Sequence, residues 1–312
     1  MIKNGVFLLK KHNFSSGRKC FNRIKALFPV IISIVLFSCK SMPNGTKVKA
    51  VDLLDNNNNF YISIPNAVDP ELIKYVIKNN VKDISAKDVA ELSDRINRAY
   101  IGLDTDKKNP QIQLAVDSEI PLKLIPKILN KNSGWESVTY TPENSINKYK
   151  IYSQNAITMA FPAKHIACFG RNVKKMITKY DSIFTIPEEE SFGVSYSELD
   201  DSVLEYLTRS DSEINFIAKA PDKFLLMLTG QKLNLQLNYV KGSFVVDPKN
   251  SDQYILDFYF GFKNSKYLKA GKTLLTLAFG LTDSKSDSEN PNELYVSGIK
   301  ISKKQLYDIL SI

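Results

Sequence analysis

The side chain with the most clearly defined chemistry in this sequence is the thiol of Cys39. It follows Leu36-Phe37-Ser38 at the end of the apolar run Ala26–Phe37. A bulky aliphatic residue three positions before a cysteine and a small residue just before it form the bacterial lipobox, where the thiol receives a diacylglyceryl group. The run of 12 apolar residues is shorter than the roughly 20 that span a bilayer. The sequence therefore predicts a signal peptide at residues 1–38 and an acylated, palmitate-bearing Cys39.

The other residues that could do chemistry are sparse. His165 is the only histidine after residue 38, so histidine-based metal sites and Ser-His triads are poorly supplied. Gly271-Lys272-Thr273 resembles the end of a P-loop, but Lys266 stands where that motif needs a glycine. The acidic pairs below fall in predicted hairpin turns without EF-hand spacing. They are Asp104 with Asp106 and Asp247 with Asp252. We expect no metal, no cofactor, no catalytic residues and no enzymatic activity.

The charge of the chain is unevenly distributed. The 42 Lys and Arg against 33 Asp and Glu give a net charge of +9, but seven basic residues and no acidic ones lie in residues 1–38. The rest of the chain is close to neutral, at +2. It therefore lacks the excess of basic residues that nucleic-acid-binding proteins use to bind phosphate groups. The 43% hydrophobic and 24% charged residues are those of a globular protein.

The cysteines agree with an exported, acylated chain that has no disulfide. Cys20 is lost with the signal peptide, Cys39 is acylated, and Cys168 has no partner. Cys168 lies in an apolar run, where we expect it to fill the core. Residues 39–58 contain Pro43 and Asn44-Gly45 and end within the run of four consecutive Asn at residues 56–59, so we expect a flexible tether there.

Strand and helix signals alternate from Phe60 onward. The expected strands are Phe60–Pro65, Ala99–Leu103, Gln111–Val116, Ser137–Thr141, Tyr149–Ser153, Ala156–Phe161, Ile214–Ala218, Leu233–Val246, Tyr254–Phe262 and Leu294–Ile301. The expected helices start at Asp69-Pro70 and after Ser85, and continue with Pro121–Leu129, Val173–Tyr180, Asp200–Thr208, Phe224–Leu228, Lys266–Leu281 and Lys303–Leu310. This order favours an α+β fold.

The polar stretch Pro187–Ser191 is the best internal boundary. We therefore expect units at residues 59–186 and 187–312, each with a hairpin, a helix, a further strand and a closing helix. The fold class is then α+β with two similar halves, each a mainly antiparallel sheet with helices packed on it, which indicates an internal duplication.

The segment Lys266–Leu281 is a candidate membrane-binding helix. Its lysines share one side near its start and its apolar residues cover most of the rest, a composition that suits anionic lipid. The candidate membrane-binding residues are Lys266, Leu268, Lys269, Lys272, Leu274, Leu275, Leu277 and Phe279. Pro121–Lys131 and Arg171–Lys179 have a similar composition. The alternative is that such helices face the core while their lysines extend into water.

This combination resembles the spirochaetal outer-membrane lipoproteins, best known in treponemes, over about Phe60–Ile312. The residues that carry the resemblance are the Leu36–Cys39 lipobox, the strand Phe60–Pro65, Gly134-Trp135 at a strand entry and the helix Lys266–Leu281. The resemblance implies a duplicated α/β body and a non-enzymatic protein. It also implies anchoring at the inner leaflet of the outer membrane, with the amphipathic helices engaging lipid.

Three classes of function follow. The first is a lipoprotein of the cell envelope, anchored through Cys39 with its body facing the periplasm, that engages or perturbs the membrane through amphipathic helices. The second is a binding module or a scaffold subunit of an outer-membrane assembly, with an outer-membrane protein as partner. Its candidate contact aromatics are Trp135, Tyr140, Tyr149 and Tyr152. The third is an unrecognised hydrolase.

Overall fold

The computed structural model describes residues 48–80, 84–104, 111–155, 157–187, 195–279, 284–286 and 290–310. All of these residues belong to one compact unit. The predicted signal peptide, Cys39 and the first half of the predicted tether lie outside the described residues.

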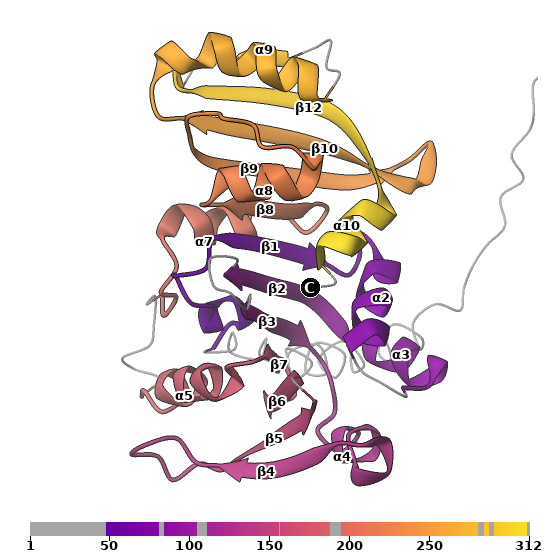
Figure 1. Cartoon of the computed structure of the whole chain (residues 1–312). Coiled ribbons are helices and arrows are strands. Elements are labelled where there is room, and N and C mark those ends of the chain that lie inside the picture. The colour runs from indigo at the N-terminus through magenta and orange to yellow at the C-terminus, as the bar shows by residue number, and fades with distance from the viewer. Residues whose placement is uncertain are drawn as a thin grey trace, which may run out of the picture. The chain divides into compact units, whose positions relative to one another are not determined.

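The described strands form one 12-stranded antiparallel sheet in the order β11-β12-β10-β9-β8-β1-β2-β3-β7-β6-β5-β4. The strands are β1 Phe60–Pro65, β2 Ile96–Asp104, β3 Gln111–Ser118, β4 Glu136–Tyr140, β5 Tyr149–Gln154, β6 Ile157–Ala163, β7 Ile166–Gly170, β8 Ile214–Ala218, β9 Leu237–Asp247, β10 Asn250–Phe262, β11 Ser284–Ser286 and β12 Glu293–Ser302. Figure 1 shows the sheet running from β12 at one end of the body to β4 at the other.

Helices cover the sheet on both faces. They are α2 Pro70–Asn80, α3 Ala86–Ser93, α4 Ile125–Ile128, α5 Val173–Phe184, α7 Asp201–Thr208, α8 Pro221–Thr229, α9 Leu268–Phe279 and α10 Lys303–Leu310, with short 3-10 turns η1 Ala50–Leu53, η2 Lys131–Ser133 and η3 Ser265–Tyr267. Local sequence explains several ends: the Ser85 hydroxyl accepts a hydrogen bond from the Asp88 N–H at the start of α3, and Gly230 ends α8 in the left-handed conformation.

Side chains of the central strands alternate between two cores, because successive residues of a strand point to opposite faces. Ile62 of β1 and Ile101 of β2 pack in the core beneath α2, α8, α9 and α10, whereas Tyr61 and Tyr100 pack in the core beneath η1, α5 and α7. We call these the first and the second face. A smaller core around Trp135 and α4 continues the first face towards β5 and β6.

The expectation of a flexible tether up to residue 58 is wrong from Val48 onward. Val48, Val51, Leu53 and Leu54 are buried in the core of the second face, where η1 packs against β3 and α5. The apolar side chains recur too densely in Val48–Leu54 for a solvated linker, and burying them outweighs the cost of ordering the segment.

The expectation of two units with separate sheets is also wrong. β1 is hydrogen-bonded to β8, with Ile62 opposite Phe216, so the sheet continues across the boundary expected at residues 187–191. If each half had its own sheet, β1 and β8 would each be a buried-type apolar strand with one edge unpaired. The order strand, helix and hairpin does occur twice, as β1, α2, α3, β2, β3 and as β8, α8, β9, β10. The duplication itself stays a prediction.

Candidate functional site

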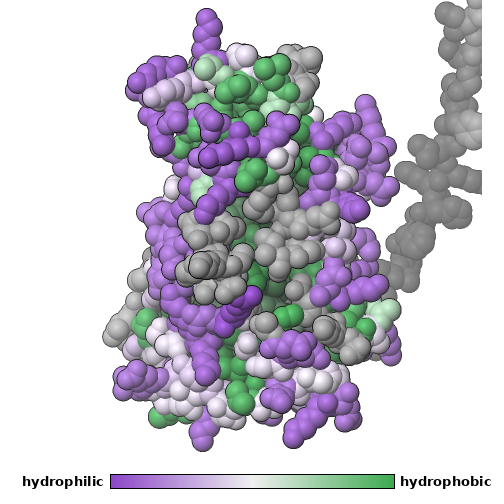
Figure 2. All heavy atoms as spheres, viewed as in Figure 1, coloured by the Kyte–Doolittle hydropathy of each residue, from purple (hydrophilic) through white to green (hydrophobic). Residues whose placement is uncertain are grey.

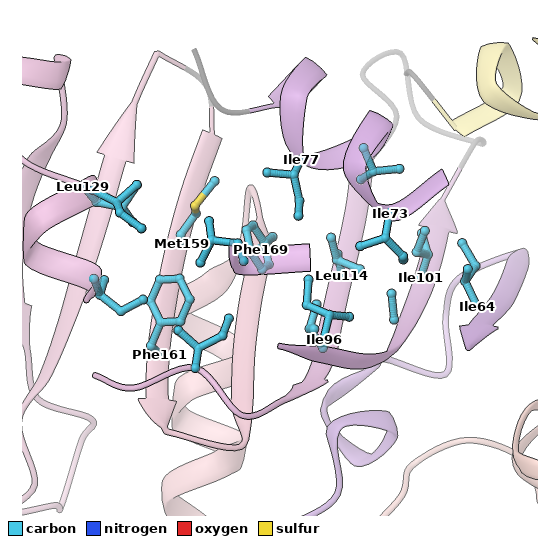
Figure 3. Close-up of a pocket in the computed structure, with 17 residues that line it drawn as sticks. Ile64, Ile73, Ile77, Ile96, Ile101, Leu114, Leu129, Met159, Phe161 and Phe169 are labelled. Carbon is cyan, nitrogen blue, oxygen red and sulfur yellow. The ribbon is translucent and has the colours of Figure 1, made fainter. Parts of the chain in front are cut away.

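An apolar cavity lies between the first face of the sheet and the helices α2, α3 and α4. Its volume is about 60 Å³, and all 17 lining side chains are apolar. The strands supply side chains such as Ile101, Leu114 and Phe169, and α2 supplies Ile73 and Ile77 (Figure 3). It therefore sits where the two cores of the first face meet.

The chemistry of this lining selects apolar ligands. A buried water needs two to four polar partners and about 10–15 Å³, and the lining side chains offer no polar atom. On the same volume scale, about 60 Å³ holds roughly four to six groups of the size of water or a methylene. The cavity fits a segment of an acyl chain and excludes a polar or charged substrate.

A buried polar cluster holds α2, one wall of the cavity, in place. Asp69 is buried at the start of α2, where its Oδ1 accepts hydrogen bonds from the backbone N–H groups of Glu71 and Leu72. Its Oδ2 lies 2.8 Å from Lys303 Nζ of α10 and accepts a hydrogen bond from the hydroxyl group of Tyr254 on β10. Burial, followed by the hydrogen bond to Asp69, raises the pKa of Tyr254, so its hydroxyl remains a donor.

The predicted membrane-binding residues divide between the core and the surface. Leu275 is fully buried, and Leu268 and Phe279 pack against the core of the first face. Leu277 is 76% exposed and Leu274 is 42% exposed. Figure 2 shows apolar residues gathered at the end of the body where α9 lies. The two leucines are therefore the part of the predicted apolar surface that lipid could reach without unfolding of α9.

The three lysines predicted to bind membrane at residues 266–272 also differ in their exposure to solvent. Lys266, in η3, and Lys269, in α9, are exposed, whereas Lys272 is half-buried. Gly271 allows the close approach of α9 to β10, because a Cβ there would lie 2.2 Å from the Phe262 ring. The Gly271-Lys272-Thr273 triplet thus lies inside a packed helix rather than in a phosphate-binding loop.

The residues with potential catalytic chemistry are not assembled. Cys168 is buried as expected, and burial raises the pKa of its thiol. Burial also lowers the pKa of His165. Among the described residues, no group of three or more His, Cys, Asp or Glu could hold a metal ion. Asp247 pairs with Lys300, and Asp106 lies outside the described residues.

The aromatic residues considered for a binding module are largely engaged within the fold. Trp135 and Tyr152 are buried together in the small core of the first face. Tyr149 donates a hydrogen bond to Asp181, and the Tyr140 hydroxyl lies 2.9 Å from Thr178 Oγ1. The prediction that Trp135 and Tyr152 contact a binding partner is therefore wrong, because both side chains are buried.

The cavity was missed by sequence reasoning. Its lining comes from three helices and five strands, each of which shows an ordinary core pattern. A pattern of this kind predicts that a residue is buried, but it does not predict whether side chains from opposite elements fill the space between them.

The fold is shared with an envelope lipoprotein of known structure. Crystal form I of TP0453 matches with a TM-score of 0.59 at 18% identity, covering 85% of this chain and 97% of that chain. Crystal form III matches with a TM-score of 0.61 at 17% identity, covering 85% and 98%. Among curated proteins, no match to this sequence is found.

The family model described as outer membrane-associated lipoprotein TP0453 matches residues 45–307. The chain belongs to this family. The resemblance to treponemal outer-membrane lipoproteins and the lipid-anchored location in the cell envelope are thereby confirmed. In the described part of the chain, no helix is both long and apolar enough to span a membrane.

Proposed function

We propose that this protein is a non-enzymatic lipoprotein, anchored through Cys39, whose body binds membrane lipid by taking an acyl-chain segment into the apolar cavity. The observation that carries the proposal is a cavity of about 60 Å³ with only apolar side chains in its lining. A membrane-anchored body meets acyl chains at high local concentration, which favours their binding over that of dilute apolar solutes.

The burial of an acyl segment supplies enough free energy for such binding. Each methylene transferred from water into an apolar site contributes about 0.8 kcal/mol. Four to six methylenes therefore contribute roughly 3–5 kcal/mol. This is the scale of a reversible interaction, suitable for lipid that must be taken up and released.

Filling the cavity is expected to weaken lipid binding strongly while leaving the fold intact. Ala99 lines the cavity and is buried, so Ala99→Leu places three extra carbons in the cavity. We expect at least a tenfold loss of binding of a fluorescent fatty acid, corresponding to about 1.4 kcal/mol or more. Ala270→Leu is the matched control, because Ala270 is exposed on α9. Undiminished binding by a folded Ala99→Leu variant would overturn the cavity proposal.

A second candidate function is direct membrane contact through α9. Leu274 and Leu277 are exposed, and Lys266 and Lys269 lie near the start of the same helix. Because these leucines are already outside the core, inserting them into lipid requires no loss of packing. The exposed parts of the two side chains together contribute about 2–3 kcal/mol on insertion.

Exchanging both exposed leucines for aspartate tests this contact. In the unacylated chain carrying Cys39→Ala, Leu274→Asp with Leu277→Asp is expected to weaken binding to anionic vesicles by roughly 30- to 150-fold. Leu226→Asp is the control, since Leu226 is a 46% exposed leucine on α8. Circular dichroism checks that all variants fold. Equal vesicle binding by folded variants, or no binding by the parent at low salt, would exclude this contact and favour a protein partner.

A further inference from the structure

The packed chain begins close to the predicted acylation site. Val48 is buried on the second face, and Cys39 precedes it by nine residues. Nine residues span at most about 30–32 Å when fully extended, and about 15–18 Å as a flexible chain. The leaflet that holds the acyl chains therefore lies within that distance of Val48.

Polar contacts fix the start of the packed chain to the body. Asp55 Oδ2 lies 2.7 Å from Lys175 Nζ on α5 and accepts a hydrogen bond from Gln113 of β3. The backbone oxygen of Leu54 accepts a hydrogen bond from Lys179. Because both contacts hold η1 against α5 and β3, the attachment point cannot move far from α5 without breaking them.

Exposed cations and apolar side chains lie at α5 and on the segments docked against it. They form what we call the α5 surface: Val138, Ile146, Lys148, Arg171, Lys174 and Phe184. Ile146 is 94% exposed, Val138 55% and Phe184 53%. Asn147 and Tyr149 donate hydrogen bonds to Asp181, and Lys174 lies over the Tyr140 ring. These contacts dock β4, β5 and their connection on α5, so the residues form one surface.

The charge of this surface suits anionic lipid. Segments 138–150 and 171–184 hold six Lys and Arg against two Asp and Glu, in a chain whose charge after residue 38 is only +2. Two of the six, Lys175 and Lys179, pair with Asp55 and Glu198, which leaves four cations against the two carboxylates. Such a local basic cluster is attracted to an anionic leaflet within about one Debye length. The acidic run Glu188–Glu190 follows α5 and lies outside the described residues. The cations Arg171 and Lys174 lie at the opposite end of α5, where Lys174 lies over the Tyr140 ring.

The exposed leucines of α9 are poorly placed to reach the same leaflet. α9 packs on β12, six strand positions from β3, against which η1 packs. At about 4.8 Å per strand, this separation is roughly 29 Å. α9 also lies on the other face of the sheet, at the far end of the body in Figure 1. If α9 contacted the leaflet that holds Cys39, the nine residues between Cys39 and Val48 would have to be almost fully extended.

We infer that the α5 surface rests on the anionic lipid leaflet that holds the acylated Cys39, and that α9 faces away from that leaflet. The membrane contact considered above for α9 would then be with a different bilayer. The inference uses the lipid anchor and the reach of the chain. It does not require that the cavity bind lipid, so the two proposals can fail separately.

Site-specific quenching in the anchored protein tests this orientation. The full acylated protein is placed in phosphatidylcholine vesicles with phosphatidylglycerol and a headgroup nitroxide, after Ile146→Cys or Ala270→Cys is labelled with a fluorophore. The thiol of Cys168 is fully buried and adds no label. We expect severalfold stronger quenching at position 146 than at position 270. Stronger quenching at 270, equal quenching at both, or none at either would overturn the inference.

Charge reversal shows whether the cations set the orientation. In the Ile146→Cys protein, Arg171→Glu with Lys174→Glu is expected to reduce quenching to the level seen at position 270. The matched change Lys266→Glu with Lys269→Glu is expected to leave it unchanged, because those lysines lie at the α9 end. Equal effects of both pairs would overturn the role of the α5 surface. Mass spectrometry of lipid retained by the same proteins reports on the cavity independently.

Discussion

Replacing Asp69 with alanine is expected to lower the free energy of unfolding by about 3–5 kcal/mol, the range found when one partner of a buried ion pair is removed. Asp69 is 2% exposed. Its loss leaves the Lys303 ammonium and the Tyr254 hydroxyl without their shared acceptor. It also removes the acceptor for two backbone N–H groups at the start of α2. Denaturant unfolding with an unchanged slope measures the effect.

Two variants separate the contributions at this site. Asp69→Asn keeps one acceptor oxygen, which can serve either the two backbone N–H groups or the Tyr254 hydroxyl but not both. Its cost should therefore be smaller than that of Asp69→Ala. Glu71→Ala removes an exposed partner of Lys74 on the same helix and is expected to cost no more than about 0.5 kcal/mol. If Asp69→Ala cost as little as Glu71→Ala, the cluster would have no role in holding α2.

Replacing Cys39 with alanine is expected to remove the lipid anchor altogether. The lipobox interpretation makes this thiol the attachment point of the diacylglyceryl group. Cys39→Ala should therefore abolish labelling by radioactive fatty acid and move the protein from the detergent phase to the aqueous phase. Two or more long acyl chains give stable anchoring at about 0.8 kcal/mol per buried methylene. No weak contact of the body replaces that free energy.

The other two cysteines serve as controls for acylation. Cys20 lies in the predicted signal peptide, and Cys168 is buried in the second face. Cys20→Ala and Cys168→Ala should therefore leave labelling unchanged. Persistent fatty-acid labelling of the Cys39→Ala protein would contradict the lipobox interpretation and require another attachment site.

Most elements could be predicted from local patterns. Phe60–Pro65 begins and ends as expected, and so does Ile214–Ala218. Ser85 caps its helix as expected. These elements could be predicted because capping residues, prolines and strand-forming residues act on the chain within a few positions of themselves. The strand β7 was missed, since its run Ile166–Gly170 is apolar on both faces and lacks the alternation that marks a half-buried strand.

The arrangement of those elements in space was much harder to predict from the sequence. The pairing of β1 with β8 depends on which apolar edges meet in space, and nothing within either strand specifies the other. The burial of Val48–Leu54 did have a signal, in its closely spaced apolar residues, but the flanking Asn-Gly and Asn-rich stretches suggested a linker. For α9, periodicity identified an amphipathic helix and could not decide which leucines face the core. The structure buries Leu275 and exposes Leu277.

The position of β1 in the middle of the sheet has a consequence for the order in which the chain is made. Among the described strands, β1 is the first to be synthesised and exported, and β2 can pair with one of its edges early. Its other edge must wait for Ile214–Ala218, which emerges roughly 150 residues later, a long-range pairing that is slow to form. All six residues of β1 are buried in the finished sheet. A chain stalled before residue 214 would therefore present an open apolar strand edge to its neighbours, and such an edge is a site of aggregation until β8 covers it.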